Sequence, residues 1–281
     1  MQTTLENSVT FSGVGLHSGI LANLTLKPAP VNHGILFKRV DIVLGNPLVR
    51  ARWDYVSDTT LSTRLKNEDG TMVSTVEHLM AALAGCGVTN ALIELDSEEV
   101  PILDGSAAPF VKGILEVGLN NISSLSRIIK IIKPVIFKSE FGWARLSPHQ
   151  CPEMEYFIEF DDRAIGIQSK TLNMSNGSFV KELSSSRTFC SSKDVETMRE
   201  NGLALGGNYS NALVFEDDKV LSPGGMRHQD EAVRHKMLDA FGDLALAGAP
   251  ILGKYEGHKA CLLYTSPSPR DQRGSRMPAS G

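Results

Sequence analysis

Residues 74–95 read STVEHLMAALAGCGVTNALIEL and set the pattern for the whole chain. Apolar residues recur at helical spacing until Gly85, which predicts a helix over residues 75–84. A strand over residues 90–95 follows the glycine-rich turn. This succession is typical of a helix that packs on one face of a small sheet.

The same succession returns near the other end of the chain. Residues 229–247 have helical periodicity, Gly248 ends the helix, and residues 251–253 resume as a strand. Further helices are expected at residues 107–117, 179–183 and 193–200, and strands at residues 7–12, 22–27, 34–40, 60–65, 143–146, 153–160 and 169–174. We therefore predict an α+β fold of two similar two-layer domains, each a small, mostly antiparallel sheet packed on a helix pair.

The polar, turn-prone residues 120–124 separate the two halves. We predict one domain over residues 1–124 and a second, incomplete at its C-terminal end, over residues 125–260. The tail over residues 261–281 has no apolar periodicity, so we expect it to be disordered.

Length and composition indicate a globular protein that binds small molecules. The 281 residues, 42% of them hydrophobic, suit about two domains with a sizeable core. A net charge of -4 offers no broad positive field for nucleic acid or an anionic membrane. Residues 1–11 lack the basic start of a secretory signal, and the apolar stretch 128–137 is too short to span a membrane, so we expect a cytoplasmic protein. The four cysteines are isolated in sequence, which argues against a disulfide framework and a thiolate zinc site.

Residues 235–243, HKMLDAFGD, carry the strongest chemical signal. On a helix, His235, Asp239 and Asp243 recur at intervals of four and line one face. His235 and Asp239 are then within reach of one divalent metal such as zinc, and Asp243 can orient the imidazole. The alternative is a helix face with ordinary ion pairs, which the spacing alone does not exclude.

Glu77 and His78 form a second candidate pair. A catalytic zinc usually has three protein ligands, an open position for water and a nearby carboxylate. His78 is the candidate third ligand and Glu77 the candidate base. The alternatives are that Glu77 closes a capping box with Ser74 and that His78 is an ordinary hydrogen-bonded histidine.

Three glycine-rich stretches contain no nucleotide-binding fingerprint. They are GVGLHSG at residues 13–19, DGSAAPF at residues 104–110 and LALGG at residues 203–207. None has the G-K-[ST] of a P-loop or a strand-framed G-x-G-x-x-G, so we expect neither ATP nor NAD. Residues 104–106 read on their own as a turn before a helix N-cap.

Taken together, six segments resemble the UDP-3-O-acyl-N-acetylglucosamine deacetylases, the zinc enzymes of bacterial lipid A biosynthesis. In chain order they are residues 13–19, 74–79, 104–110, 187–189, 205–207 and 234–243. They occur in the family's order, and the resemblance covers residues 1 to about 260. Each segment alone is weak evidence, whereas six in register are specific.

The resemblance implies an active site with Zn²⁺ at the interface of the two domains. His78, His235 and Asp239 match the family's zinc ligands, and Glu77 matches the general base that takes a proton from water. The other matches are Thr188, a hydroxyl that helps to hold the oxyanion, Lys236, a cation beside the reacting group, and Asp243, a carboxylate behind the ligands.

The resemblance also implies the substrate. Positions that match the family's substrate contacts are Leu61, Ser62, Phe160, Phe189 and His17. The implied reaction is hydrolysis of the N-acetyl group of acylated UDP-N-acetylglucosamine, with release of acetate. Residues 203–207 are expected to line an apolar groove for the acyl chain, and we expect a monomer.

The chain departs from the family pattern after residue 260. The family continues as Gly-His-Ala-Leu-Asn-Asn, whereas this chain reads CLLYTS and has Leu262 where the family has its second catalytic histidine. Leucine neither stabilises charge nor donates a proton, and His258 lies four positions early, so we expect an impaired deacetylase with a non-native tail. The rival hypotheses are a non-catalytic binding protein for acylated sugar nucleotides and a structural α+β protein that binds no zinc.

Overall fold

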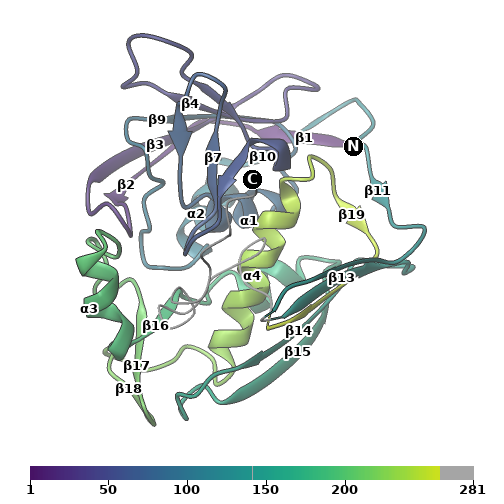
Figure 1. Cartoon of the computed structure of the whole chain (residues 1–281). Coiled ribbons are helices and arrows are strands. Elements are labelled where there is room, and N and C mark those ends of the chain that lie inside the picture. The colour runs from purple at the N-terminus through teal and green to yellow at the C-terminus, as the bar shows by residue number, and fades with distance from the viewer. Residues whose placement is uncertain (141, 260–281) are drawn as a thin grey trace, which may run out of the picture.

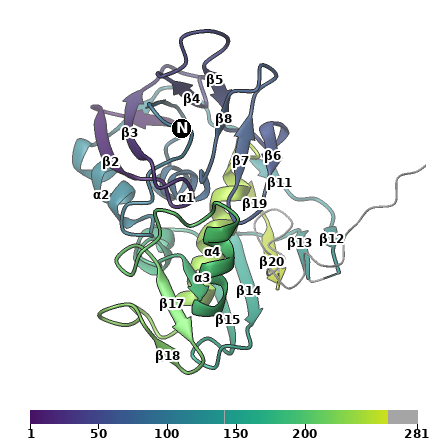
Figure 2. The same cartoon turned by 60° about the vertical axis from the view of Figure 1, so that its left-hand side comes forward.

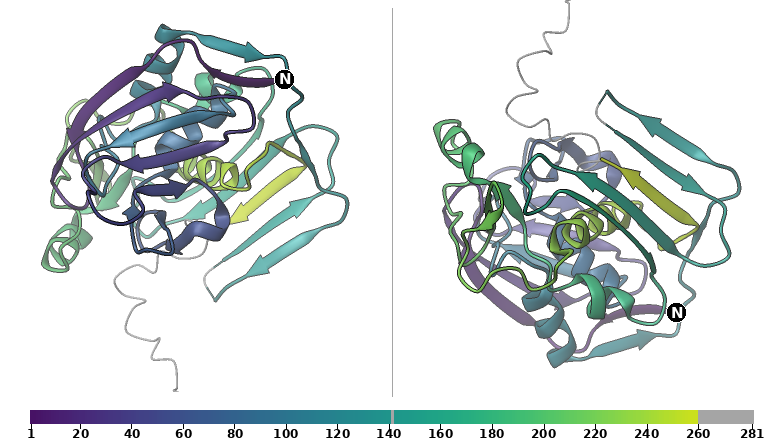
Figure 3. Two further views of the ribbon diagram at one scale, coloured as in Figure 1. Left: turned by 90° about the horizontal axis from the view of Figure 1, so that it is seen from above. Right: turned by 90° about the horizontal axis from the view of Figure 1, so that it is seen from below.

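The computed structural model describes residues 1–140 and 142–259 and shows two five-stranded sheets with helices between them (Figure 1). The first sheet contains β2 (Val9–Val14), β3 (Leu21–Pro28), β4 (Ile35–Arg39), β5 (Leu48–Arg50) and β9 (Ala91–Leu95). The second contains β12 (Val135–Lys138), β13 (Trp143–Ser147), β14 (Glu153–Glu159), β15 (Ile167–Asn173) and β20 (Lys254–His258). Views from above and below show one sheet on each side of the helices (Figure 3).

The two sheets have the same topology. Their strand orders are β2-β3-β9-β4-β5 and β12-β13-β20-β14-β15, so the strand that comes last in the chain lies at the centre of each sheet. In both sheets this strand is antiparallel to one neighbour and parallel to the other, and the remaining pairs are antiparallel. The predicted α+β fold of two similar halves is therefore confirmed. The domain limits at residues 124 and 125 stay a prediction, and the expected disordered tail and Leu262 lie outside the described residues.

Helices α1 (Glu77–Gly85) and α4 (Glu231–Ala245) pack against each other between the sheets (Figures 1 and 2). The close approach requires Gly242, because a Cβ atom there would collide with the backbone carbonyl of Glu77. Helix α2 (Ala108–Val117) covers β2, where Phe110 meets Phe11 edge to face at 5.0 Å. Helix α3 (Ser192–Glu200) lies at the margin of the molecule.

Smaller elements complete each half, and none of the small sheets pairs strands across the halves within the described residues. They are the pair β1 (Gln2–Leu5) and β10 (Leu119–Ile122), the pair β11 (Ile129–Lys130) and β19 (Ile251–Leu252), the sheet of β6 (Val56–Asp58), β7 (Arg64–Lys66) and β8 (Met72–Val73), the sheet of β16 (Phe189–Ser191), β17 (Leu213–Glu216) and β18 (Lys219–Val220), a 3-10 helix (Trp53–Tyr55) and a π-helix (Phe179–Leu183). One apolar cluster runs through both halves. Within the described ranges, none of the helices has the length and apolar character to span a membrane.

Two local predictions were wrong in detail, and one predicted helix forms with a different geometry. The capping box between Ser74 and Glu77 does not form, because the Ser74 hydroxyl donates to the Glu98 carbonyl at 3.1 Å and α1 begins only at Glu77. Thr75, at φ 58°, turns the chain sharply before the helix. The strand expected over residues 60–65 is limited to β7, since Leu61, at φ 62°, leaves the extended region. The helix expected over residues 179–183 forms as a π-helix.

Candidate metal centre

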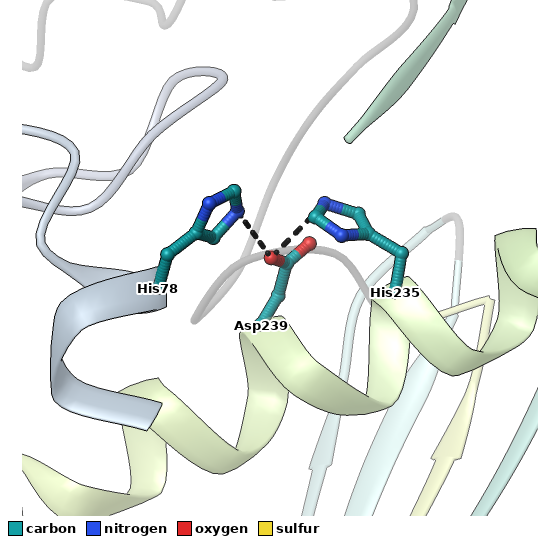
Figure 4. Close-up of side chains that lie close together, drawn as sticks. All are labelled: His78, His235 and Asp239. Atoms are coloured by element: carbon teal, nitrogen blue, oxygen red, sulfur yellow. Dashed lines mark ion pairs between the residues drawn. The ribbon is translucent and has the colours of Figure 1, made fainter. Parts of the chain in front are cut away.

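His78, His235 and Asp239 meet where α1 crosses α4 (Figure 4). His78 lies in the first turn of α1, and His235 and Asp239 lie one turn apart on α4. Oδ1 of Asp239 is 3.4 Å from Nε2 of His78 and 3.3 Å from Nε2 of His235. One potential ligand atom from each side chain lies within 4.8 Å of the other two, so the three side chains can coordinate a single ion.

The three side chains are almost entirely buried, with exposed fractions of 4%, 3% and 5%. Oδ1 of Asp239 and Nδ1 of His78 nevertheless have no hydrogen-bond partner. Buried polar atoms without partners are costly and rare in native proteins, whereas a divalent cation bound here would satisfy the carboxylate oxygen. Two imidazoles and one carboxylate form a donor set that zinc accepts, so these residues fit such an ion.

The protonation states favour metal binding. Burial lowers the pKa of His235 to about 4, so this imidazole is neutral at neutral pH. Burial acts to raise the pKa of Asp239, but His235, His78 and Lys236 outweigh it and lower that pKa to about 2. Metal ligands must be deprotonated, and both groups meet that requirement.

A backbone carbonyl holds the ring of His235 on the side away from Asp239. Its Nδ1–H donates to the carbonyl of Ser186 at 3.1 Å, which leaves the lone pair of Nε2 directed toward Asp239. Such a backbone acceptor fixes the tautomer and orientation of a metal-binding histidine. Ser186 had no signal in the sequence, because it is 49 residues from His235 and meets it only through the fold.

Glu77, the residue before His78, has a buried carboxylate beside this cluster. Its Oε2 accepts a 3.0 Å hydrogen bond from the backbone N–H of Thr63. Burial, followed by the nearby carboxylates of Asp239 and Asp243, raises its pKa well above the ordinary value. A carboxylate whose pKa is raised holds a proton more readily than an ordinary glutamate does.

Thr63 joins two predicted site residues and was missed in the sequence. Besides the bond to Glu77, its hydroxyl donates to Oδ1 of Asp243 at 2.7 Å. Thr63 has no exposed surface, and its neighbour Ser62 is only 2% exposed. The sequence predicted a strand over residues 60–65, whereas Leu61 leaves the extended region and Thr63 lies just before β7.

Lys236, Phe189 and Phe160 form a chain of contacts next to the cluster. Nζ of Lys236 is 3.7 Å from Oδ2 of Asp239 and 5.6 Å above the Phe189 ring. The Phe189 ring is 6.0 Å from that of His235 and 5.4 Å from that of Phe160. One cation, Lys236, and two aromatic rings therefore lie next to the candidate ligands.

Thr188 follows the segment that supports His235. Its backbone N–H donates to the Gly105 carbonyl at 2.8 Å, and its carbonyl accepts from the N–H of Leu213 at 2.8 Å. The first bond ties Thr188 to residues 104–106, which form the expected turn before α2, and the second ties it to β17. In that turn the Ser106 hydroxyl accepts from the N–H of Ala108 at 3.2 Å. The Thr188 side chain is partly buried.

His17 lies in a loop that meets the glycine-rich residues 203–207. The N–H of Ala204 approaches Nδ1 of His17 at 3.4 Å, and the His17 carbonyl accepts from the N–H of Leu205 at 3.1 Å. Nε2 of His17 is buried without a partner, and burial lowers the pKa of this imidazole. Glu99, which the sequence did not single out, holds the loop through the N–H groups of residues 17 and 18 at 2.9 and 2.8 Å.

The fold and the site define the class: an α+β protein with a His-His-Asp cluster of the kind that metal-dependent hydrolases use. The model of the UDP-3-O-acyl N-acetylglycosamine deacetylase family matches residues 2–262. The UDP-3-O-acyl-N-acetylglucosamine deacetylase of Idiomarina loihiensis is 46% identical over 263 residues, which are 92% of this chain and 85% of the relative. Proteins of the same name from Shewanella frigidimarina and Histophilus somni are 44% and 43% identical over 262 and 263 residues, again 92% of this chain and 85% of each relative. The chain belongs to the UDP-3-O-acyl-N-acetylglucosamine deacetylase family and is a hydrolase of the deacetylase type.

Proposed function

We propose that this chain hydrolyses the N-acetyl group of UDP-3-O-acyl-N-acetylglucosamine and releases acetate in a zinc-dependent reaction of lipid A biosynthesis. The observation that carries the proposal is the convergence of His78, His235 and Asp239 within 4.8 Å in a member of this family. The proposed ligands are Nε2 of each histidine and the carboxylate of Asp239. When bound, Zn²⁺ supplies Lewis-acid activation of the carbonyl and lowers the pKa of water toward neutrality.

Glu77 is the proposed general base. It takes a proton from the attacking water, and the oxygen of that water forms the new bond to the acetamide carbon. Thr188 and Lys236 are the proposed donors to the oxyanion that develops on the carbonyl oxygen. Collapse of the tetrahedral species breaks the C–N bond, and the amine leaves with a proton that Glu77 can return.

Asp243 is proposed to act by position rather than by contact with the substrate. Its carboxylate accepts a hydrogen bond from the Thr63 hydroxyl, and the backbone N–H of Thr63 donates to the carboxylate of Glu77. Leu61, Ser62, His17, Phe160 and Phe189 are the proposed substrate contacts. The loop contacts between His17 and Leu205 support a site that extends toward residues 203–207, where we propose that the acyl chain lies.

The second catalytic histidine of the family is proposed to be missing from this chain, because Leu262 stands at that position. Replacing residues 261–266 by Gly-His-Ala-Leu-Asn-Asn is expected to raise kcat by roughly 10²- to 10⁴-fold, the usual contribution of a positioned acid or base. An unchanged kcat would contradict the proposed impairment.

Acetate release from UDP-3-O-acyl-N-acetylglucosamine tests the proposed function. We expect turnover that stops with a chelator, returns with Zn²⁺ and is lost in Glu77→Gln. The control is Glu98→Gln, which alters an exposed side chain immediately before the buried Glu99. A non-catalytic binding protein, which the leucine at position 262 favours, would instead bind the substrate without releasing acetate. Fractionation and sedimentation test the proposed cytoplasmic location and monomeric state.

A further inference from the structure

Glu231 is a buried carboxylate that no part of the proposed reaction uses. It is the first residue of α4, one helical turn before His235, and has no exposed surface. Oε1 accepts from the backbone N–H and from Nε of Arg187, both at 3.0 Å. Oε2 accepts from Nη2 of Arg187 at 3.2 Å and from the backbone N–H of Arg227 at 2.5 Å.

With these four bonds each oxygen of the Glu231 carboxylate accepts two hydrogen bonds, which offset the cost of burying its charge. Burial opposes ionisation, but the donors from Arg187 and Arg227 lower the pKa of Glu231, so the carboxylate is charged. One of the four donors is a main-chain amide of the segment that supports the metal centre. The carboxylate therefore fixes the backbone position of Arg187 as well as its side chain.

Two consecutive residues of that segment contact α4. Glu231 binds the N–H of Arg187, and His235 donates through Nδ1–H to the carbonyl of Ser186. That carbonyl and that N–H belong to the same peptide group, because the C=O of one residue is bonded to the N–H of the next. The peptide is planar, so an acceptor that orients the N–H also orients the carbonyl, which points the opposite way.

We propose that Glu231 is a positioning residue for the metal centre, which holds the Ser186–Arg187 peptide so that its carbonyl fixes the tautomer of His235. With the carbonyl in place, Nδ1 of His235 carries the proton and Nε2 keeps a lone pair for a metal. Without Glu231, the peptide can rotate and the other tautomer becomes populated, in which Nε2 carries the proton. The effect on turnover rests on the proposed function, whereas the effect on the tautomer does not.

The test compares Glu231→Gln with Asp230→Asn. Asp230 is the adjacent acidic residue, but it is partly exposed and binds Lys170 at 2.9 Å and Arg234 rather than Arg187, so it is a matched control. Long-range ¹H–¹⁵N spectra of the metal-free protein report the His235 tautomer, with His235→Gln used for assignment. We expect the Nδ1–H form in the unmodified chain and in Asp230→Asn, and a mixture of tautomers in Glu231→Gln.

Zinc titration provides a second readout. Removing the partner of a metal-binding histidine typically weakens affinity by about 10- to 100-fold, so Glu231→Gln should do the same while Asp230→Asn stays within about twofold. If Glu231→Gln fails to fold, Glu231→Asp keeps the charge and shortens the reach, and it should shift the tautomer in the same direction. A folded Glu231→Gln with the unmodified tautomer and affinity would overturn the inference. A shifted tautomer in a chain that never releases acetate would uphold it and contradict the proposed function instead.

Discussion

The Thr63 hydroxyl donates a 2.7 Å hydrogen bond to Oδ1 of Asp243, across 180 residues of sequence. The backbone N–H of the same threonine binds Glu77, so one fully buried residue from the first half holds a carboxylate on each of the two central helices. The proposed base is thus fixed relative to α4, which carries two of the three candidate ligands. The geometry of the site depends on this link as well as on the ligands.

Thr63→Val removes the hydroxyl and keeps the shape and the backbone N–H. We expect a loss of about 1–3 kcal/mol in the free energy of unfolding, since a buried carboxylate loses a donor. The measurement is urea unfolding monitored by circular dichroism. The control is Thr60→Val, which removes a hydroxyl that donates to Asp58 at 2.9 Å. That bond is only partly buried, so the loss in the free energy of unfolding should be smaller. Equal losses in the two variants would show that the buried Thr63 bond stabilises the protein no more than the partly buried Thr60 bond does.

Gly242→Ala tests the close packing of α1 on α4. Alanine favours a helix by about 1 kcal/mol over glycine, so the local effect alone would stabilise the protein. The added Cβ atom meets the Glu77 carbonyl, and we expect the overpacking to win, with a net loss of about 1–3 kcal/mol. Thermal unfolding gives the sign directly. A variant that melts at a higher temperature than the unmodified chain would contradict the described approach of the helices.

The pKa of Glu99 predicts how the stability of the protein depends on pH. Burial acts to raise its pKa, but hydrogen bonds from His17, Ser18 and Thr75 outweigh burial and lower the pKa below the ordinary value of 4.5. A lowered folded-state pKa means that the carboxylate stabilises the protein above pH 4.5 and that this contribution is lost as pH falls through the lowered value.

Unfolding of Glu99→Gln at several pH values measures this contribution. At neutral pH we expect the variant to be less stable by about 1–3 kcal/mol, the worth of charged hydrogen bonds. The difference from the unmodified chain should shrink below pH 4.5. A difference that stays constant down to pH 2 would mean that ionisation of Glu99 does not contribute.

The sequence predicted the elements that carry the site, but not the contacts between them. Helical periodicity located α1 and α4, and the spacing of His235 and Asp239 placed them on one face. The capping box was wrong, because Ser74 binds the carbonyl of Glu98 and the Glu77 carboxylate binds Thr63, and both partners depend on the fold. Ser186 and Glu231 escaped notice for the same reason: a backbone carbonyl and a common acidic residue acquire a role only when the fold brings them to His235 and Arg187.

The number of zinc ions bound per chain tests the central claim most directly. Metal analysis after dialysis against a slight excess of Zn²⁺ should give one ion for the unmodified chain and for His149→Gln, which alters an exposed histidine. His78→Gln and Asp239→Asn, which change one donor on each central helix, should each give a small fraction of one ion. Full zinc content in a folded His78→Gln, or none in the unmodified chain, would contradict the account.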